Sequence, residues 1–162
     1  MAEQGKADSI KTMRFFDGLT DEELNEVAKI CVETAFSEGQ ICQAEGQTAS
    51  GIHLIVKGKV GSVTRIPNAT VPGSEMILEE FRKGDLFGWS SLTKGTSSWP
   101  AIRALEPVST LYIKAGDLVD LCELNTRIGY ITMRNLSSII ASRLKRNRMS
   151  MLNAIVAIKG EW

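Results

Sequence analysis

Residues 84–104, which read GDLFGWSSLTKGTSSWPAIRA, combine groups that can bind a small anion. Gly88 allows the backbone to approach a ligand closely, and the residues after it can open a short helix. The first backbone N–H groups of a helix lack intrahelical partners and attract negative charge. Ser90 and Ser91 add hydroxyls that can bind phosphate oxygens. The ligand corner predicted from this pattern consists of Gly88, Trp89, Ser90 and Ser91.

The chain has few of the residues that catalytic and metal sites need. A metal-binding β-roll enzyme needs several histidines and a carboxylate around one ion, and the chain has a single histidine, His53. We expect His53 on a strand surface. An axial haem ligand is the alternative, without a convincing second ligand.

An iron–sulfur cluster needs four thiolates, whereas this chain has three widely spaced cysteines that read as reduced thiols. They are Cys31, Cys42 and Cys122. The sequence contains no P-loop or dinucleotide fingerprint. We therefore expect a non-catalytic protein with no resident metal.

Charge is divided unevenly along the chain. Residues 1–125 contain 12 Lys and Arg against 18 Asp and Glu, whereas residues 126–162 contain 7 against 1. The basic segment fits a solvated helix face, with an acidic partner as the alternative. We do not expect this chain to bind DNA, because no base-reading motif accompanies the basic residues.

The N-terminal sequence and the hydropathy predict a cytoplasmic location. The start, MAEQGKADS, is polar and lacks the apolar core of a secretory signal. No apolar run reaches the roughly 18 residues that a membrane span needs. We accordingly expect no membrane association.

Two kinds of segment surround the ligand corner. Residues 1–34 read as helices, because Thr20 and Glu23 form a capping box before an amphipathic stretch. Residues 35–114 contain short apolar runs between glycines, which is the pattern of an all-β sandwich or jelly roll. This part is predicted to be the sensor core.

Residues 115–162 return to helical spacing, with a short helix followed by a long one from about Thr126. A small β-domain cannot cover the whole apolar stripe of the long helix, so its far half needs a second copy of itself. The predicted dimer residues are Ile128, Ile131, Leu136, Ile139, Ile140, Leu144, Met151 and Leu152. Arg143 and Asn147 fall close to this stripe and weaken it. We expect one structural domain that forms a homodimer.

This order of segments resembles the cyclic nucleotide-binding domain family, which includes catabolite-activator-like regulators, kinase regulatory subunits and gated channels. The resemblance covers roughly residues 15–152. The phrases that carry it are FSEGQICQAEGQ, IHLIVKGKV, GDLFGWSSL and PAIRALEPVSTLYI. It implies a mainly β fold with flanking helices: an eight-stranded β-roll, N-terminal helices and a long C-terminal dimerisation helix.

The segment 84–104 resembles the family's phosphate-binding cassette and departs from it at two positions. In the family, a glutamate accepts a hydrogen bond from the ribose hydroxyl, and an arginine pairs with the cyclic phosphate. Trp89 and Ser98 stand at these positions. Lys94 is a replacement cation without the arginine fork, and Arg103 has the strand parity of a residue that points away.

These departures weaken the case for a cyclic nucleotide. A charge-assisted hydrogen bond contributes roughly 1.5–3 kcal/mol. We therefore expect a corner without its fixed positive charge, and no tight binding of cyclic AMP or cyclic GMP by the family mechanism.

Trp89 and Trp99 bracket the corner, where they either line an aromatic pocket or fill a vacant one. The leading hypothesis is a sensor module. A small anionic effector binds at the ligand corner and Ser98, and its occupancy biases the long helix and, through it, a downstream protein. One alternative is an interaction module without a ligand, closed by Trp89. The other is a genuine receptor for cyclic AMP or cyclic GMP in which Lys94 replaces the arginine.

Overall fold

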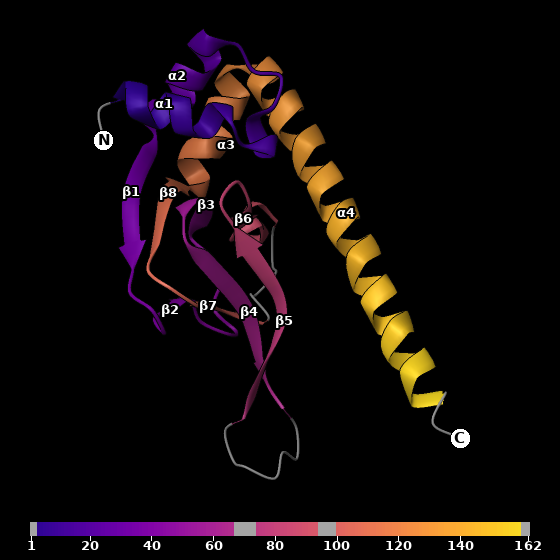
Figure 1. Ribbon diagram of the computed structural model, residues 1–162. Coiled ribbons are helices and arrows are strands. Elements are labelled where there is room, and N and C mark those ends of the chain that lie inside the picture. Colours follow the sequence, from indigo (N-terminus) through magenta and orange to yellow (C-terminus); the bar gives the residue numbers. More distant parts are fainter. Residues whose placement is uncertain (1–2, 67–73, 94–99, 160–162) are drawn as a thin grey trace.

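The computed structural model describes residues 3–66, 74–93 and 100–159 (Figure 1). Within these residues, eight strands form two antiparallel sheets, ordered β1-β8-β3-β6 and β2-β7-β4-β5. The strands are β1 Cys31–Phe36, β2 Ile41–Gln43, β3 Gly51–Lys57, β4 Lys59–Arg65, β5 Glu75–Arg82, β6 Leu86–Phe87, β7 Ala101–Ala104 and β8 Val108–Lys114. The predicted eight-stranded β-roll is confirmed.

The pairing of β3 fixes the position of β6, which leads into the ligand corner. Ile52 and Leu54 lie on one face of β3 and are fully buried in the larger core cluster. On one side of β3, they lie opposite Ile113 and Leu111 of β8. On the other side, Leu54 lies opposite Leu86 of β6. The core of the roll therefore holds the start of the corner in place.

Three short helical elements cover one end of the roll (Figure 1). They are α1 Glu3–Lys11, the 3-10 helix η1 Arg14–Phe16 and α2 Asp21–Lys29. The predicted capping box is confirmed at α2, where Thr20 Oγ1 accepts from the Glu23 amide and Glu23 Oε2 accepts from the Thr20 amide, at 3.3 and 2.8 Å. β1 begins at Cys31 rather than at residue 35, because the whole of β1 pairs with β8.

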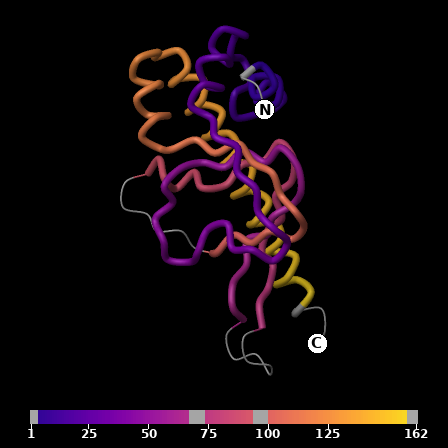
Figure 2. The backbone as a smooth tube through the Cα atoms, turned by 90° about the vertical axis from the view of Figure 1, so that its left-hand side faces the viewer, coloured from indigo at the N-terminus to yellow at the C-terminus, as the bar shows by residue number. Residues whose placement is uncertain are grey.

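Two helices follow the roll: α3 Ala115–Leu124 and the 34-residue α4 Thr126–Lys159, which confirms the predicted long helix. Polar contacts tie the start of α4 to the N-terminal helical elements. Arg127 pairs with Glu23, and Asn135 Nδ2 donates to the carbonyl oxygens of Phe15 and Asp17, at 3.2 and 2.8 Å. The yellow end of α4 stands apart from the strands in Figure 1, and α4 passes behind the roll in Figure 2.

The predicted dimer residues fall into two groups along α4. Ile128, Ile131 and Leu136 are buried inside this chain, with 0%, 6% and 6% of their surface exposed. Ile139 and Ile140 are partly buried against the same core. The chain's own core thus covers these five side chains wholly or in part. The exposed members are Leu144, Met151 and Leu152.

Candidate functional site

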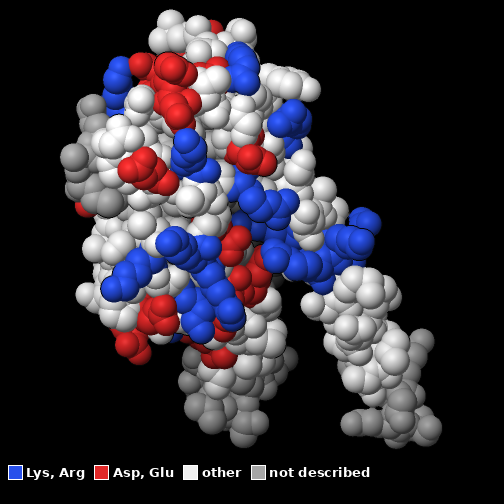
Figure 3. Space-filling model, turned by 45° about the horizontal axis from the view of Figure 1, so that its top comes forward, with Lys and Arg blue, Asp and Glu red and all other residues white. Residues whose placement is uncertain are grey.

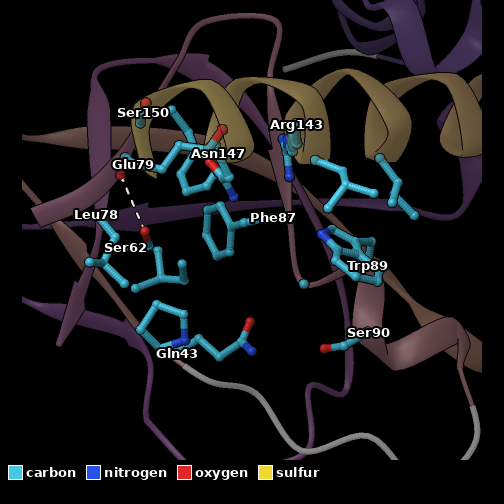
Figure 4. A pocket seen from close by; sticks show the side chains of 16 residues that line it. Gln43, Ser62, Leu78, Glu79, Phe87, Trp89, Ser90, Arg143, Asn147 and Ser150 are labelled. Carbon is cyan, nitrogen blue, oxygen red and sulfur yellow. Dashed lines mark hydrogen bonds between the residues drawn. The ribbon is translucent and has the colours of Figure 1, made fainter. Parts of the chain in front are cut away.

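A cavity of about 750 Å³ lies between the second sheet, the segment after β6 and α4 (Figure 4). The strands contribute Gln43, Ser62, Leu78, Glu79, Phe81, Phe87 and Ile102. The segments next to the strands contribute Gly88, Trp89, Ser90 and Pro100. The helix α4 contributes Ile140, Arg143, Leu144, Asn147 and Ser150. The walls are therefore mostly apolar, with a few polar groups.

Gly88 is required by the backbone that forms the corner. Its φ is +82°, in the left-handed region that favours glycine. A Cβ at this position would also collide with the carbonyl oxygen of Gly51 in β3. The chain then enters a 3-10 helix, η2 Trp89–Leu92, in which the Ser91 amide donates to the Gly88 carbonyl oxygen at 3.0 Å. Close packing against β3 therefore demands glycine here, before any ligand is considered.

Three of the predicted site residues line the cavity: Gly88, Trp89 and Ser90. Ser91 is not among the lining residues, and its buried Oγ has no hydrogen-bond partner in the described parts of the chain. The other three predicted residues, Lys94, Ser98 and Trp99, lie outside the described residues. The role of all seven as ligand contacts stays a prediction.

Arg143 lines the cavity from α4 and is not among the predicted site residues. It points toward the side of the cavity where Phe87 and Trp89 lie (Figure 4). Only 8% of its surface is exposed. Its Nη2 donates to the Leu86 carbonyl oxygen at 2.6 Å, and its Cζ lies 4.6 Å from the centre of the Phe81 ring.

The prediction of a corner without a fixed positive charge stays a prediction, but Arg143 brings such a charge to the cavity that the corner lines. The cation comes from a helix more than fifty residues beyond the corner. Helical spacing alone predicts that Ile140, Arg143 and Asn147 share a face of the helix, because they recur every three or four residues. That spacing alone does not tell which part of the roll the face meets. Asn147 and Arg143 were assigned to the edge of the dimer stripe instead.

Acidic and basic groups surround Arg143. Burial lowers the pKa of its guanidinium, and the nearby carboxylates of Glu79 and Asp85 oppose this shift. Glu79 itself pairs with Arg146, at 2.8 Å, and its backbone oxygen accepts from Ser62 Oγ at 3.4 Å (Figure 4). A second hollow of about 280 Å³ adjoins Arg143 and includes Arg14, Lys145 and Arg146. Basic side chains gather over this part of α4 in Figure 3.

Comparison with known proteins identifies the fold family. Residues 33–125, more than half of the chain, match the model of the cyclic nucleotide-binding domain. The chain belongs to this family. Cyclic nucleotide-gated ion channel 17 of Arabidopsis thaliana is 27% identical to this cyclic nucleotide-binding domain over 117 residues, which are 68% of the chain and 16% of the channel. The chain thus spans only a small part of the curated relative it matches.

Solved structures show the same fold. A cyclic nucleotide-binding domain from Methylobacillus flagellatus KT superposes with a TM-score of 0.78 at 17% identity, over 93% of this chain and 82% of the other. The catabolite activator protein of Thermus thermophilus gives a TM-score of 0.68 at 23% identity, over 85% of this chain and 61% of the other. These identities establish the β-roll architecture that the sequence resemblance implied.

In this cyclic nucleotide-binding domain, His53 lies inside an aromatic cluster rather than on a strand surface. Its ring stacks on Phe87, with 4.7 Å between centroids, and also contacts Phe36 and Tyr112. Its Nδ1 is hydrogen bonded to Thr110 Oγ1 at 3.0 Å. Burial lowers the pKa of His53 to about 4, so the ring is neutral at pH 7.

The described residues contain no arrangement that indicates a metal site or a membrane span. Among the described residues, no three or more His, Cys, Asp or Glu side chains are grouped to hold a metal ion. No described helix has the length and hydropathy to cross a bilayer. Arg103, which was expected to point away from the pocket, pairs with Glu75 at 2.6 Å and is not among the cavity-lining residues.

Proposed function

We propose that this chain is a regulatory module that senses a small ligand. The observation that carries the proposal is the cavity, because its walls come both from the β-roll and from α4. A ligand in contact with both walls binds more tightly to one position of α4 than to others. Its occupancy therefore shifts the population of helix positions, which is how a binding event becomes a signal.

The size of the cavity supports a site that is open to a ligand. Small-molecule sites have volumes of about 300–1,000 Å³, and this cavity has about 750 Å³ with Trp89 in its wall. A tryptophan that filled the site would leave no such space. This argues against the alternative of an interaction module closed by Trp89.

The proposed sensor acts through a homodimer. An exposed stripe on α4 contacts the second copy of the chain. The side chains of the stripe are apolar or aromatic, and 37–67% of the surface of each is exposed. Its members are Tyr130, Met133, Leu144, Met151 and Ile155. Because Leu144 also lines the cavity, ligand and dimer contacts share one segment of α4. A downstream protein partner and a cytoplasmic location remain part of this proposal.

A cyclic nucleotide is the second candidate effector, and Arg143 is the observation that favours it. The guanidinium brings to the cavity a positive charge that Ser98 does not supply. A cyclic phosphate could pair with it on the α4 side of the cavity. Trp89 still supplies no acceptor for a ribose hydroxyl.

Calorimetric titration with cyclic AMP and cyclic GMP, together with native mass spectrometry for co-purifying small molecules, tests both candidates. A dissociation constant below about 10 µM for either nucleotide supports the second candidate. Leu78→Trp serves as the control, because Leu78 lines the cavity and a larger side chain there narrows it. The sensor proposal is contradicted if the wild type and Leu78→Trp bind both nucleotides equally and retain the same co-purifying molecules, or none.

A further inference from the structure

Arg143 is a buried cation without a buried anion. Its side chain is 92% removed from solvent, since 8% is exposed. Among residues 3–66, 74–93 and 100–159, no carboxylate oxygen lies within 4.0 Å of its guanidinium. The single described acceptor is the neutral carbonyl oxygen of Leu86. A guanidinium has five N–H donors, and most of them have no partner among the described residues.

Such an arrangement is costly unless something completes it. A buried charge is normally paired, and an unpaired one costs several kcal/mol in effective desolvation. The Phe81 ring offers a partial cation–π contact at 4.6 Å. The planar fork of arginine matches carboxylate, sulfonate or phosphate oxygens better than it matches a carbonyl. The unused donors therefore suit an anionic group brought by a ligand.

The rest of the cavity limits what that ligand can be. The walls beside Arg143 are apolar and partly aromatic, with Phe87, Trp89 and Ile102 among them. Glu79 is also in the wall, so a second negative charge on the ligand would meet repulsion. The remaining polar groups, such as Asn147, are uncharged. This environment suits one negative charge on a flat apolar body.

We propose that the cavity binds a small amphipathic monoanion whose acidic group is received by the Arg143 guanidinium. The flat body of the ligand lies against Phe87, Trp89 and Ile102. The inference rests on the proposed sensing function, since the same cavity receives the effector. It makes Arg143, on α4, the anion receptor in place of the arginine of the family's phosphate-binding cassette.

A matched pair of fluorescent probes tests the charge preference. Anilinonaphthalene sulfonate is an amphipathic monoanion, and N-phenylnaphthylamine is the same aromatic body without the sulfonate. Wild-type protein should bind the sulfonate at least about tenfold more tightly than the neutral probe, as expected for a charge-assisted contact. Arg143→Met should weaken the sulfonate about tenfold to a hundredfold and leave the neutral probe unchanged. Arg148→Met, an exposed cation on the same helix, should change neither.

Further variants test the anion receptor at Arg143 separately from the sensor site in the cavity. Arg143→Lys keeps the charge and should retain part of the preference, and circular dichroism of both Arg143 variants should show native helix content. Equal sulfonate binding by wild type and Arg143→Met would overturn the anion receptor and leave the cavity intact as a sensor site. If Leu78→Trp affects neither probe, the cavity does not bind them and both the anion receptor and the sensor site fail.

Competition identifies which acidic group the site accepts. Cyclic AMP and adenosine share the flat base, and only cyclic AMP carries the phosphodiester charge. Displacement of the sulfonate by cyclic AMP and not by adenosine supports a phosphodiester at Arg143. Displacement by naphthoate and not by naphthamide supports a carboxylate. Equal displacement by the charged and uncharged members of both pairs contradicts the proposal.

Discussion

Gly88 is the residue whose backbone shapes the corner of the site. Replacing it with alanine combines a left-handed φ with a collision against the Gly51 carbonyl oxygen. We expect Gly88→Ala to lower the free energy of unfolding by about 3 kcal/mol, measured by urea denaturation.

Gly84→Ala is the matched control for this substitution. Gly84 has φ +89°, and a Cβ there would meet no atom within 4 Å. The control carries the conformational cost alone, about 1 kcal/mol. Equal losses in the two variants would show that the contact with Gly51 does not constrain the corner.

His53 makes the stability of the roll depend on pH. Its folded-state pKa of about 4 lies below the ordinary 6.5, because burial disfavours the charged ring. Between these values the unfolded chain binds more protons, so the stabilisation is complete above pH 6.5 and is lost as the pH falls toward 4. We expect a loss of about 2 kcal/mol between pH 7 and pH 4.5.

His53→Phe should remove most of this pH dependence, because His53 is the only histidine in the chain. Denaturant unfolding at several pH values in this range provides the measurement. Parallel pH profiles of the wild type and His53→Phe would mean that other groups cause the loss.

At the scale of elements, Asn135 ties α4 to η1 and to the residue that follows it. Its Nδ2 donates to the carbonyl oxygens of both Phe15 and Asp17. Asn135→Ala removes both bonds and should destabilise the fold by about 1–2 kcal/mol. Asn153→Ala, at an exposed position later in α4, should have an effect near zero in the same thermal and urea unfolding. Comparable losses in both variants would contradict this assignment, because Asn153 makes neither bond and alanine has the higher helix propensity.

Local patterns in the sequence were sufficient to predict the elements. The capping box at Thr20 and Glu23 needs only neighbouring residues, and it forms as expected. The short apolar runs between glycines and the helical spacing after Thr126 are equally local. Strand pairing is not local, and pairing with β8 is what begins β1 at Cys31.

The candidate site was harder to predict, because it depends on how α4 is rotated about its own axis against the roll. That rotation turns Arg143 into the cavity and buries Ile128 within the chain. Both residues had been assigned to the stripe or its edge. The same limit applies to Trp89, because its residue type is compatible with a side chain that fills the cavity and with one that lines it. The cavity of about 750 Å³ beside it supports the proposal that Trp89 forms part of the wall.

At the scale of the whole molecule, α4 connects the N-terminal helical elements, the cavity and the exposed apolar surface. Its start is bonded to the N-terminal helical elements through Arg127 and Asn135. Its middle forms one wall of the cavity with Arg143. Its later half exposes apolar side chains such as Met151. A ligand that moves the middle of a rigid helix must therefore also move the surface beyond it.

The exposed stripe on α4 gives a direct test of the proposed dimer. Met151 has 66% of its surface exposed, and a helix partner would bury it. Met151→Glu would place an unpaired charge in that seam, so the dimer should weaken roughly a hundredfold. Asn153→Glu introduces the same charge about half a turn away and should leave the dimer intact. Light scattering after size exclusion should give wild type and Asn153→Glu twice the 17.7 kDa chain mass, and Met151→Glu the single mass. A wild-type mass of 17.7 kDa at tens of micromolar would refute the helix pair and confine the signal to α4 of one chain.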